Sequence, residues 1–344
     1  MAQNPNSVHT QCGPSKLTAE AQLQLAVCSE IVLAFQSGPV PNYLNETLIA
    51  LIPKCQNPES LGNYRTISLC NSVYKVITKI ITARLQPFLN TLVSPLQAAF
   101  VLDRRGMDNI VVAQELIYSM DNKKGRTGFM AIKVDLEKAY DRLEWNFIHK
   151  VLRAFHFPNQ MIKLIMSCIS TTSISILFNV ETLDNFNLSR GICQGNPLSP
   201  PIFILCMEYL GSLIERECMH GNWIPMKDSR GNLEILHLFF CQRPNSVCLD
   251  LILFAKASVE GGEVIKDVLD RFCAESGQKV SSDKSYIYFS RNVKADLKAK
   301  ICSNLQIQAT NDLGKYLGFP IRHKGAARNQ FNFVAERVIN MLSG

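Results

Sequence analysis

A short apolar run in this chain ends in a carboxylate, Asp135. The run, Phe129–Val134, has the length and composition of a buried strand, and a charged stretch follows it at once. A carboxylate at the end of a buried strand is held rigidly at the sheet edge. Two-metal phosphoryl transfer requires such rigid placement, because Mg²⁺ takes oxygen ligands in a strict geometry. The alternative is that Asp135 only caps the helix that follows it.

A glycine-rich loop offers a second place for chemistry. Residues 189–200 read SRGICQGNPLSP, and an apolar run of helical length follows them. Gly191 and Gly195 lack a side chain, so the backbone there can approach a ligand closely. The alternative interpretation is an ordinary junction between a loop and a helix.

The elements that must position these residues are mixed in type. Hydrophobic periodicity predicts helices over 18–36, 71–88, 108–120, 139–155, 159–170, from the glycine-rich loop to about 217, over 260–275 and over 328–342. It predicts strands over 47–52, 129–134, 173–178, 235–240, 251–255 and 285–290. Helices and strands do not alternate in βαβ order, so the predicted fold class is α+β.

Composition limits the classes of protein that fit. The chain has 344 residues, of which 47% are hydrophobic, enough for a large core and two or three subdomains. A formal net charge of +7 permits a polyanionic partner without requiring one. The twelve cysteines form no C-x-x-C pair, which argues against zinc and favours a reducing compartment, nuclear or cytoplasmic. The polar N-terminus is unlike a signal peptide, and no apolar run would span a bilayer, so we expect neither secretion nor a membrane partner.

The stretch after the apolar run carries a family resemblance. Residues 135–145, DLEKAYDRLEW, resemble the first palm motif of reverse transcriptases from plant LINE-type (non-LTR) retrotransposons. The resemblance implies that Asp135 is the main metal ligand and that the Leu136 carbonyl is a further metal contact. It places Tyr140 at the position that senses the nucleotide sugar and rejects ribonucleotides.

Two segments before this motif and one after it extend the resemblance. Residues 51–54 (LIPK) with 63–70 (NYRTISLC) resemble the fingers motif, and residues 94–100 resemble a Ser-Pro-x-Gln-x-Ala-Phe segment. Arg65 matches the family arginine and would face the incoming triphosphate, which its fork of donors suits. Thr66 stands where the family usually has proline.

The glycine-rich loop resembles the motif that grips the template and the base-paired dNTP. Gly191, Gln194 and Gly195 match that motif, whereas Asn196 stands where the family usually has aspartate. The resemblance therefore implies substrate contacts at the three matching residues.

The C-terminal third completes the resemblance. Residues 276–285 resemble the motif whose lysine protonates the leaving pyrophosphate, which would make Lys284 a general acid; the alternative is a surface lysine. Residues 316–320 resemble the primer grip. The implied architecture is the polymerase right hand, with a disordered N-terminus (1–17), N-terminal helices and fingers (18–128), a palm (129–322) and the start of a truncated thumb (323–344).

The family's second catalytic motif is interrupted. It usually reads Phe-Ala-Asp-Asp-Leu in a tight hairpin. Here residues 237–240 match the first strand and residues 250–255 match the second, but the nine residues 241–249 replace an alanine and the first aspartate. Asp250 then corresponds to the second aspartate, and we expect the longer loop to displace it. By analogy with removal of one preorganised electrostatic group, the missing aspartate would cost about 3–4 kcal/mol, or roughly 10²–10³ in rate.

The resemblance implies an RNA-directed DNA polymerase. A primer 3′-hydroxyl would attack the α-phosphate of a dNTP with the help of two Mg²⁺ ions, Mn²⁺ being the alternative ion. The partners would be an RNA template, a DNA primer and dNTP, and the catalytic residues Asp135, Asp250 and Lys284. The interrupted hairpin predicts impaired activity, and the alternative is a catalytically defunct remnant with weak nucleic-acid binding.

Overall fold

The computed structural model describes most of the chain between residues 28 and 321. Short gaps fall at 30, 37–38, 54, 61–62, 96, 98–99, 105, 124, 179–180, 228–233, 243–247 and 317–318. The predictions for residues 1–17, for most of the helix at 18–36 and for the helix at 328–342 therefore lie outside the described residues. Residues 31–36 are helical, as expected.

Helices and strands are mixed, which confirms the α+β class. The helices are α2 (Ser72–Leu92), α3 (Gly106–Asn122), α4 (Ala139–Arg142), α5 (Trp145–Ala154), α6 (Asn159–Ser170), α7 (Ser199–Met219), α8 (Val259–Ser276) and α9 (Ala295–Leu305), with a 3₁₀ turn η1 at Asn42–Asn45. The strands are β1 (Glu46–Pro53), β2 (Tyr64–Cys70), β3 (Phe129–Val134), β4 (Ser173–Phe178), β5 (Glu181–Thr182), β6 (Phe186–Asn187), β7 (Met226–Lys227), β8 (Glu234–Ile235), β9 (His237–Gln242), β10 (Cys248–Lys256), β11 (Tyr286–Phe289), β12 (Gln308–Thr310), β13 (Lys315–Tyr316) and β14 (Phe319–Pro320).

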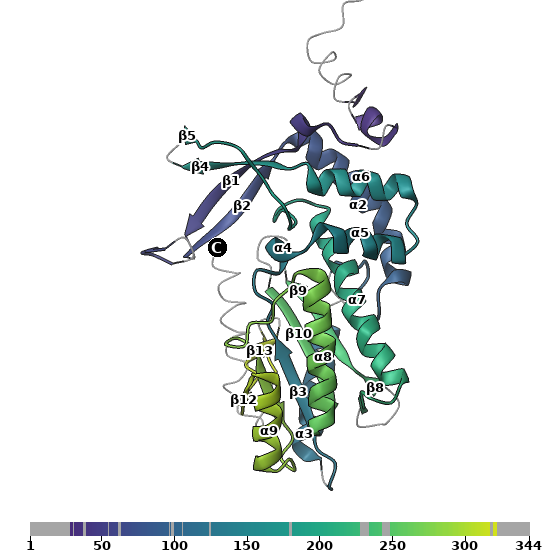
Figure 1. Ribbon diagram of the computed structural model, residues 1–344, viewed down its shortest axis with the longest axis vertical. Helices are drawn as coiled ribbons and strands as arrows, with labels where there is room; N and C mark the ends of the chain where they lie inside the picture. The colour runs from purple at the N-terminus through teal and green to yellow at the C-terminus, as the bar shows by residue number, and fades with distance from the viewer. Residues whose placement is uncertain are drawn as a thin grey trace, which may run out of the picture.

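Two sheets organise these elements. The first sheet has the strand order β2-β1-β4-β5, with β6 also paired to β4, and the second has the order β12-β11-β3-β10-β9. Figure 1 shows the first sheet projecting at the upper left and the second sheet in the lower half, with α4 between them. The helices α2, α5, α6 and α7 lie beside both sheets on the right of that view.

Strand β3 is the centre of the second sheet and is covered on both faces. Met130, Ile132 and Val134 pack into the main core with residues of α7 and α8, whereas Phe129 and Ala131 pack with residues of α3. A strand buried on both sides carries a continuous apolar run rather than an alternating one. This explains why the boundaries of β3 could be predicted from the sequence.

Helix α2 packs against α7 and the η1 turn. Its N-terminus is capped by Asn71, whose side chain accepts a hydrogen bond of 2.8 Å from the Val73 N–H. Its buried face contains Tyr74, Ile77, Thr78, Ile81, Leu85 and Leu89. The helix predicted from hydrophobic periodicity is thus confirmed.

Two predicted helix boundaries were wrong. The helix expected over 139–155 is divided into α4 and α5, because Leu143 and Glu144 are extended (ψ 119° and 133°). Their backbones bond to neighbouring loops instead of continuing the helix: the Leu143 carbonyl accepts from the Gly191 N–H, and the Glu144 N–H donates to the Ser276 carbonyl. The helix expected from residue 108 already includes Gly106, so Asp108 lies in the first turn of α3, where its charge suits the helix dipole.

Two ionisable side chains face each other inside the fold. His237 on β9 is 1% exposed, and Glu208 projects from α7. A Cβ atom at Gly211 would lie 3.4 Å from the His237 ring and 3.7 Å from the Glu208 Oε1, so both side chains border the same gap. Within the described residues, Glu208 Oε2 and both His237 ring nitrogens lack a hydrogen-bond partner.

Burial perturbs both groups. Desolvation raises the pKa of Glu208 from 4.5 to about 7, against a hydrogen bond from the Ser94 backbone and the charge of Arg104, and Glu215 raises it further. Desolvation lowers the pKa of His237 from 6.5 to about 4. Both groups therefore favour their neutral forms in the folded chain.

We expect Glu208→Gln to stabilise the protein increasingly as pH rises. A carboxyl whose pKa is raised by folding stabilises the fold below pH 4.5, and this stabilisation is lost as pH rises through about 7. The free-energy difference between variant and parent should therefore grow from near zero at pH 4.5 to about 3 kcal/mol at pH 7.5. Urea unfolding at matched pH values measures it, and a difference that does not change with pH would contradict the assignment.

Candidate active site

The site is built around the segment that leaves β3. Leu251 of β10 pairs with Val134 of β3, so the next step of this antiparallel ladder places the backbone of Asp250 opposite Asp135 at the same end of the sheet. The Asp135 N–H donates to the Ser285 hydroxyl (3.0 Å), and its carbonyl accepts from the Ser281 N–H (2.8 Å). Asp135 is thus fixed through its backbone on both sides.

The residues that interrupt the motif lengthen the antiparallel ladder between β9 and β10. Asp250 pairs with Phe240, and two further pairs follow, Leu249 with Cys241 and Cys248 with Gln242. The backbone of Asp250 lies in β10 next to Leu251, which pairs with Val134 of β3, and the expected displacement of its side chain stays a prediction. Residues 241–242 lengthen β9 and residues 248–249 lengthen β10, whereas residues 243–247 lie outside the described part of the chain.

Leu136 forms a bridge with Val280 on the segment after α8. The flanking bonds run from the Glu137 N–H to the Lys279 carbonyl and from the Ser281 N–H to the Asp135 carbonyl. In this bridge type, the Leu136 N–H and carbonyl point away from Val280. The carbonyl assigned to a metal by resemblance is thus directed away from the segment after α8.

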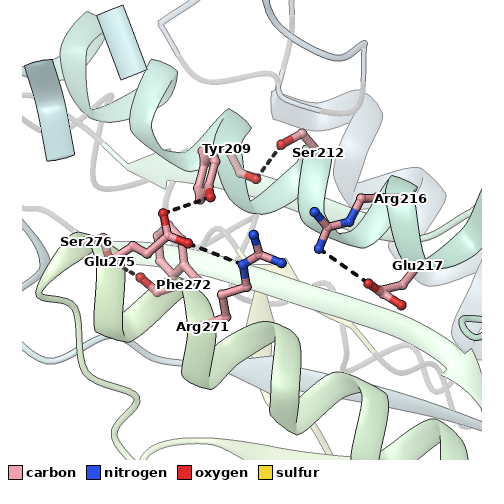
Figure 2. A network of polar contacts seen from close by, with 8 residues as sticks. All are labelled: Tyr209, Ser212, Arg216, Glu217, Arg271, Phe272, Glu275 and Ser276. Atoms are coloured by element: carbon pink, nitrogen blue, oxygen red, sulfur yellow. Dashed lines mark hydrogen bonds and ion pairs between the residues drawn. The ribbon is translucent and has the colours of Figure 1, made fainter. Parts of the chain in front are cut away.

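The C-terminal end of α8 is tied to α7 by a polar network (Figure 2). Tyr209 donates to Glu275 Oε2 (2.9 Å), and Arg271 Nε lies 3.3 Å from Glu275 Oε1. These contacts are partly exposed and each contributes little to stability. Their position is more important than their energy, because Glu275 adjoins Ser276. The segment that begins at Ser276 forms backbone hydrogen bonds with residues 135–144.

Lys284 lies on the turn that follows this segment. Its side chain is exposed and its N–H donates to the Ser281 carbonyl (3.2 Å). Ser285, the next residue, contacts the Asp135 backbone. Lys284 therefore lies one residue from a direct contact of the Asp135 backbone. Its side chain is nevertheless exposed to solvent.

Tyr140 lies in α4, one turn after Asp135. Its side chain is 3% exposed and stacks on Phe203 of α7, with ring centroids 4.7 Å apart. It lines a cavity of about 510 Å³ together with Gly195 and Asn196. The structure thus brings Tyr140 and the glycine-rich loop to one cavity.

Gly191 joins the glycine-rich loop to the same segment. Its N–H donates to the Leu143 carbonyl (2.8 Å) and its carbonyl accepts from Trp145 Nε1 (2.8 Å). Its φ is +88°, and a Cβ atom there would lie 2.7 Å from the Asp141 carbonyl oxygen. Only glycine fits this close approach. No role was predicted for Trp145, although it is the last residue of the palm-motif match and one of only two tryptophans.

The other end of the loop contacts the first sheet. The Gln194 carbonyl accepts from the Ser68 N–H (3.4 Å), and Gln194 is half-buried. Gly195 has a φ of +97°, and a Cβ atom there would lie 3.2 Å from the Ser68 carbonyl oxygen. Arg65 is three residues away from Ser68 on β2, where its backbone pairs with Ile52, and its side chain lies outside the described residues.

Asn196 is buried and fully engaged where the family usually has aspartate. Its Nδ2 donates to the Tyr74 hydroxyl (2.7 Å), its Oδ1 accepts from the Leu198 N–H (3.0 Å), and the Tyr74 hydroxyl donates to the Cys168 carbonyl (2.6 Å). An amide can donate to the tyrosine oxygen and leave the phenol proton for Cys168. A carboxylate would instead compete for that proton, so the local network suits asparagine.

The family follows from comparison with known proteins. Residues 52–321 match the family model of reverse transcriptase (RNA-dependent DNA polymerase). The chain therefore belongs to the reverse transcriptase family, which agrees with its α+β fold and with the arrangement of its motifs.

The relatives narrow the family to retrotransposons. The chain is 24% identical to a transposon TX1 protein of 149 kDa from Xenopus laevis, over 83% of the chain and 20% of that protein. It is 25% identical to the Pol polyprotein of the type-2 retrotransposable element R2DM of Drosophila melanogaster, over 94% of the chain and 30% of that protein. The chain is a reverse transcriptase domain of this non-LTR type, and it spans less than a third of the length of either relative.

A solved telomerase also resembles the chain. The telomerase of Candida tropicalis in complex with a fragment of telomeric RNA aligns over 79% of this chain and 45% of that one, with a TM-score of 0.48 and 15% identity. Separately, none of the helices in the described part of the chain has the length and apolar character that crossing a bilayer requires.

We expect Gly191→Ala to destabilise the protein more than Gly221→Ala does. Both glycines have positive φ (+88° and +76°), so both substitutions impose backbone strain of about 1–2 kcal/mol. Only at Gly191 would the new methyl group meet backbone, whereas nothing lies within 4 Å at Gly221. The additional loss should be at least about 1 kcal/mol in urea unfolding. Equal losses would show that the loop can move away from Asp141 without cost.

Proposed function

We propose that this chain is the RNA-directed DNA polymerase domain of a plant LINE-type retroelement, with nucleotidyl transfer impaired by its interrupted hairpin. In the intact reaction a primer 3′-hydroxyl attacks the α-phosphate of a dNTP opposite an RNA template. The proposed localisation is nuclear or cytoplasmic. It is supported by the cysteines, whose spacing fits neither a disulfide framework nor a zinc site, as expected in a reducing compartment.

The proposed impairment rests on the position of Asp250 within strand β10. In the family the aspartate pair occupies a tight hairpin turn. Here Asp250 pairs with Phe240, and the ladder continues for two more residue pairs before the turn. Phe240 stands opposite Asp250, and no acidic residue occurs between them in residues 241–249. The first aspartate of the pair therefore has no replacement in the hairpin.

The donor set suits a divalent metal only in part. Asp135, Asp250 and the Leu136 carbonyl offer oxygen ligands, which Mg²⁺ and Mn²⁺ prefer. Among the described residues no group of three His, Cys, Asp or Glu side chains could hold a metal ion. We propose that Asp135 and Asp250 would bind a depleted version of the family's two-ion set, because residues 241–249 supply no acidic residue in place of the first aspartate.

The remaining roles follow the motif matches. Tyr140 would select the nucleotide sugar, supported by its rigid stacking on Phe203 beside the cavity. Gly191, Gln194 and Gly195 would contact template and dNTP, Arg65 would contact the triphosphate, and Lys284 would act as general acid.

We also propose the subdomain boundaries inferred from the motifs. Fingers would occupy residues 18–128, the palm 129–322 and the start of the thumb 323–344. The boundary at 128 is supported by the two sheets, since β3 opens the second sheet directly after it.

The second candidate is a defunct remnant that keeps the fold and weak nucleic-acid binding. It is favoured by the same hairpin, because loss of a metal ligand impairs catalysis without unfolding the sheet. Replacing residues 241–249 by Ala-Asp restores the family hairpin and separates the candidates.

The repaired protein should extend a DNA primer on an RNA template in Mg²⁺ or Mn²⁺, at least about 10²-fold faster than the parent chain. The gain is expected because the repair restores one carboxylate and shortens the hairpin. Primer extension resolved on a gel measures it. The matched control replaces the same residues by Ala-Asn, which shortens the hairpin equally without the carboxylate and should stay near the parent rate.

Other outcomes would decide against parts of this proposal. Vigorous extension by the parent chain would contradict the impairment. Failure of the repaired protein to extend while still binding primer–template would favour the defunct remnant. Extension that persists after Asp135→Asn in the repaired protein would overturn the role of Asp135.

A further inference from the structure

The connector between α2 and α3, residues 94–105, contacts the β9–β10 hairpin from the side. Residues 96, 98–99 and 105 of this connector lie outside the described part of the chain. Strand β9 ends the strand order of the second sheet, and an edge strand presents a row of backbone groups that another segment can bond. Gln97 of the connector forms an isolated parallel bridge with Phe239 at this edge, and both residues are buried. The connector therefore covers part of the open edge of β9.

The start of α3 contacts the same position of β9. The Asn109 side chain is buried, and its Nδ2 donates to the Phe239 carbonyl (3.3 Å). Gln97 lies before the end of the connector and Asn109 lies shortly after it. The connector is thus held against Phe239 at two points along its path.

Phe239 stands next to the residue pair that contains Asp250. Phe239 pairs with Leu251 of β10, which pairs in turn with Val134 of β3. The next pair along the β9–β10 ladder joins Phe240 to Asp250. A contact that fixes Phe239 therefore also fixes the backbone of the hairpin where Asp250 lies beside the end of β3.

Arg104 determines the shape of the connector. Its guanidinium group donates to two carbonyls at the end of α2, those of Asn90 and Val93 (3.0 Å each). It also donates to two carbonyls of the connector itself, those of Ser94 and Gln97 (2.7 Å to Gln97). Five donors in a fixed planar fork allow one side chain to make all these bonds. Arg104 therefore links the end of α2 to the residue that bridges β9.

A simpler role for Arg104 would be to cap α2. The last carbonyls of a helix have no partner within the helix, and a cation there suits the helix dipole. A cap, however, requires only the bonds to Asn90 and Val93. The bonds to Ser94 and Gln97 reach beyond the helix, and the one to Gln97 ends at the contact with Phe239.

We propose that Arg104 is a positioning residue for the β9–β10 hairpin. It fastens the connector to the end of α2, so that Gln97 holds the edge of β9 and, through the ladder, the backbone of Asp250 beside β3. The effect on catalysis rests on the proposed function. The hold on the edge of β9 applies to the chain whether or not it polymerises DNA.

Hydrogen–deuterium exchange of the full chain tests the hold on β9 without any need for catalysis. Arg104→Gln should speed amide exchange in residues 237–242 by about tenfold, because a loosened connector lets the edge strand open more often. Arg104→Lys keeps the charge but donates from a single point, so it should give a smaller increase in the same residues, and it provides the comparison if the glutamine variant does not fold.

The matched control is Arg153→Gln. Arg153 lies in the last turn of α5 with an exposed side chain, so the same chemical change at another helix end should leave β9 as in the parent. Faster exchange of Arg104→Gln at the end of α2 alone would overturn the proposal, since Arg104 would then be only a cap. An equal increase in β9 and in α8 would also overturn it, because general destabilisation would then explain the change.

Primer extension tests the catalytic part in the protein whose residues 241–249 are replaced by Ala-Asp. There Arg104→Gln should lower kcat about tenfold and change the KM for dNTP by less than about twofold, because a metal ligand moves while the substrate contacts stay. Arg104→Lys should recover part of kcat. A raised KM with unchanged kcat would overturn the positioning role. If the repaired protein does not extend primers, the proposed function fails, and the exchange measurement alone decides whether Arg104 holds β9.

Discussion

The structure depends on a segment that is bonded on both sides. Residues 135–144 leave β3 and pass between the glycine-rich loop and the segment after α8. On one side, Gly191 and Ile192 donate to carbonyls of Leu143 and Tyr140; on the other, Ser281 donates to Asp135. Unpaired buried backbone groups are costly, so these bonds fix three sequence-distant loops relative to one another. This arrangement also requires glycine at 191, since the loop approaches Asp141 too closely for a side chain.

This constraint explains what could be predicted from sequence. The residues of β3 were predicted because a doubly buried strand has a continuous apolar pattern, and α2 because a cap precedes a periodic stripe. The interruption between α4 and α5 was missed, since residues 143–144 are held extended by backbone hydrogen bonds to partners at least 48 residues away in sequence. The strand β2 and the helix α9 were also not predicted. In α9 only Ile301 is fully buried, so its amphipathic signal is weak.

The site shows the same division. Motif matches brought Asp135, Tyr140, Gly191, Gln194 and Gly195 into one region, and the structure places their backbones around the segment 135–144 and the cavity beside it. The supporting contacts of Trp145, Tyr74 and Ser285 were not predicted, although Trp145 and Ser285 lie within the motif matches, because a hydrogen bond to a distant backbone group leaves no spacing pattern. Asn196 illustrates the difference further. Compared with the family's aspartate, the asparagine lacks a negative charge. In the fold, however, its side chain donates a hydrogen bond to the Tyr74 hydroxyl and accepts one from the Leu198 N–H.

The hairpin departs from the family pattern in two ways that have different physical origins. The first is chemical: residues 241–249 stand where the family has an alanine and the first aspartate, and none of them is acidic. The second is steric: two further residue pairs extend the β9–β10 ladder about 7 Å beyond Asp250, at a rise of 3.4 Å per residue. A single substitution of Leu249 by aspartate would place a carboxylate next to Asp250 and leave the hairpin long, whereas replacing residues 241–249 by Ala-Asp changes both features. Because β10 keeps its register with β3 despite the insertion, shortening the hairpin need not disturb the sheet that holds Asp135.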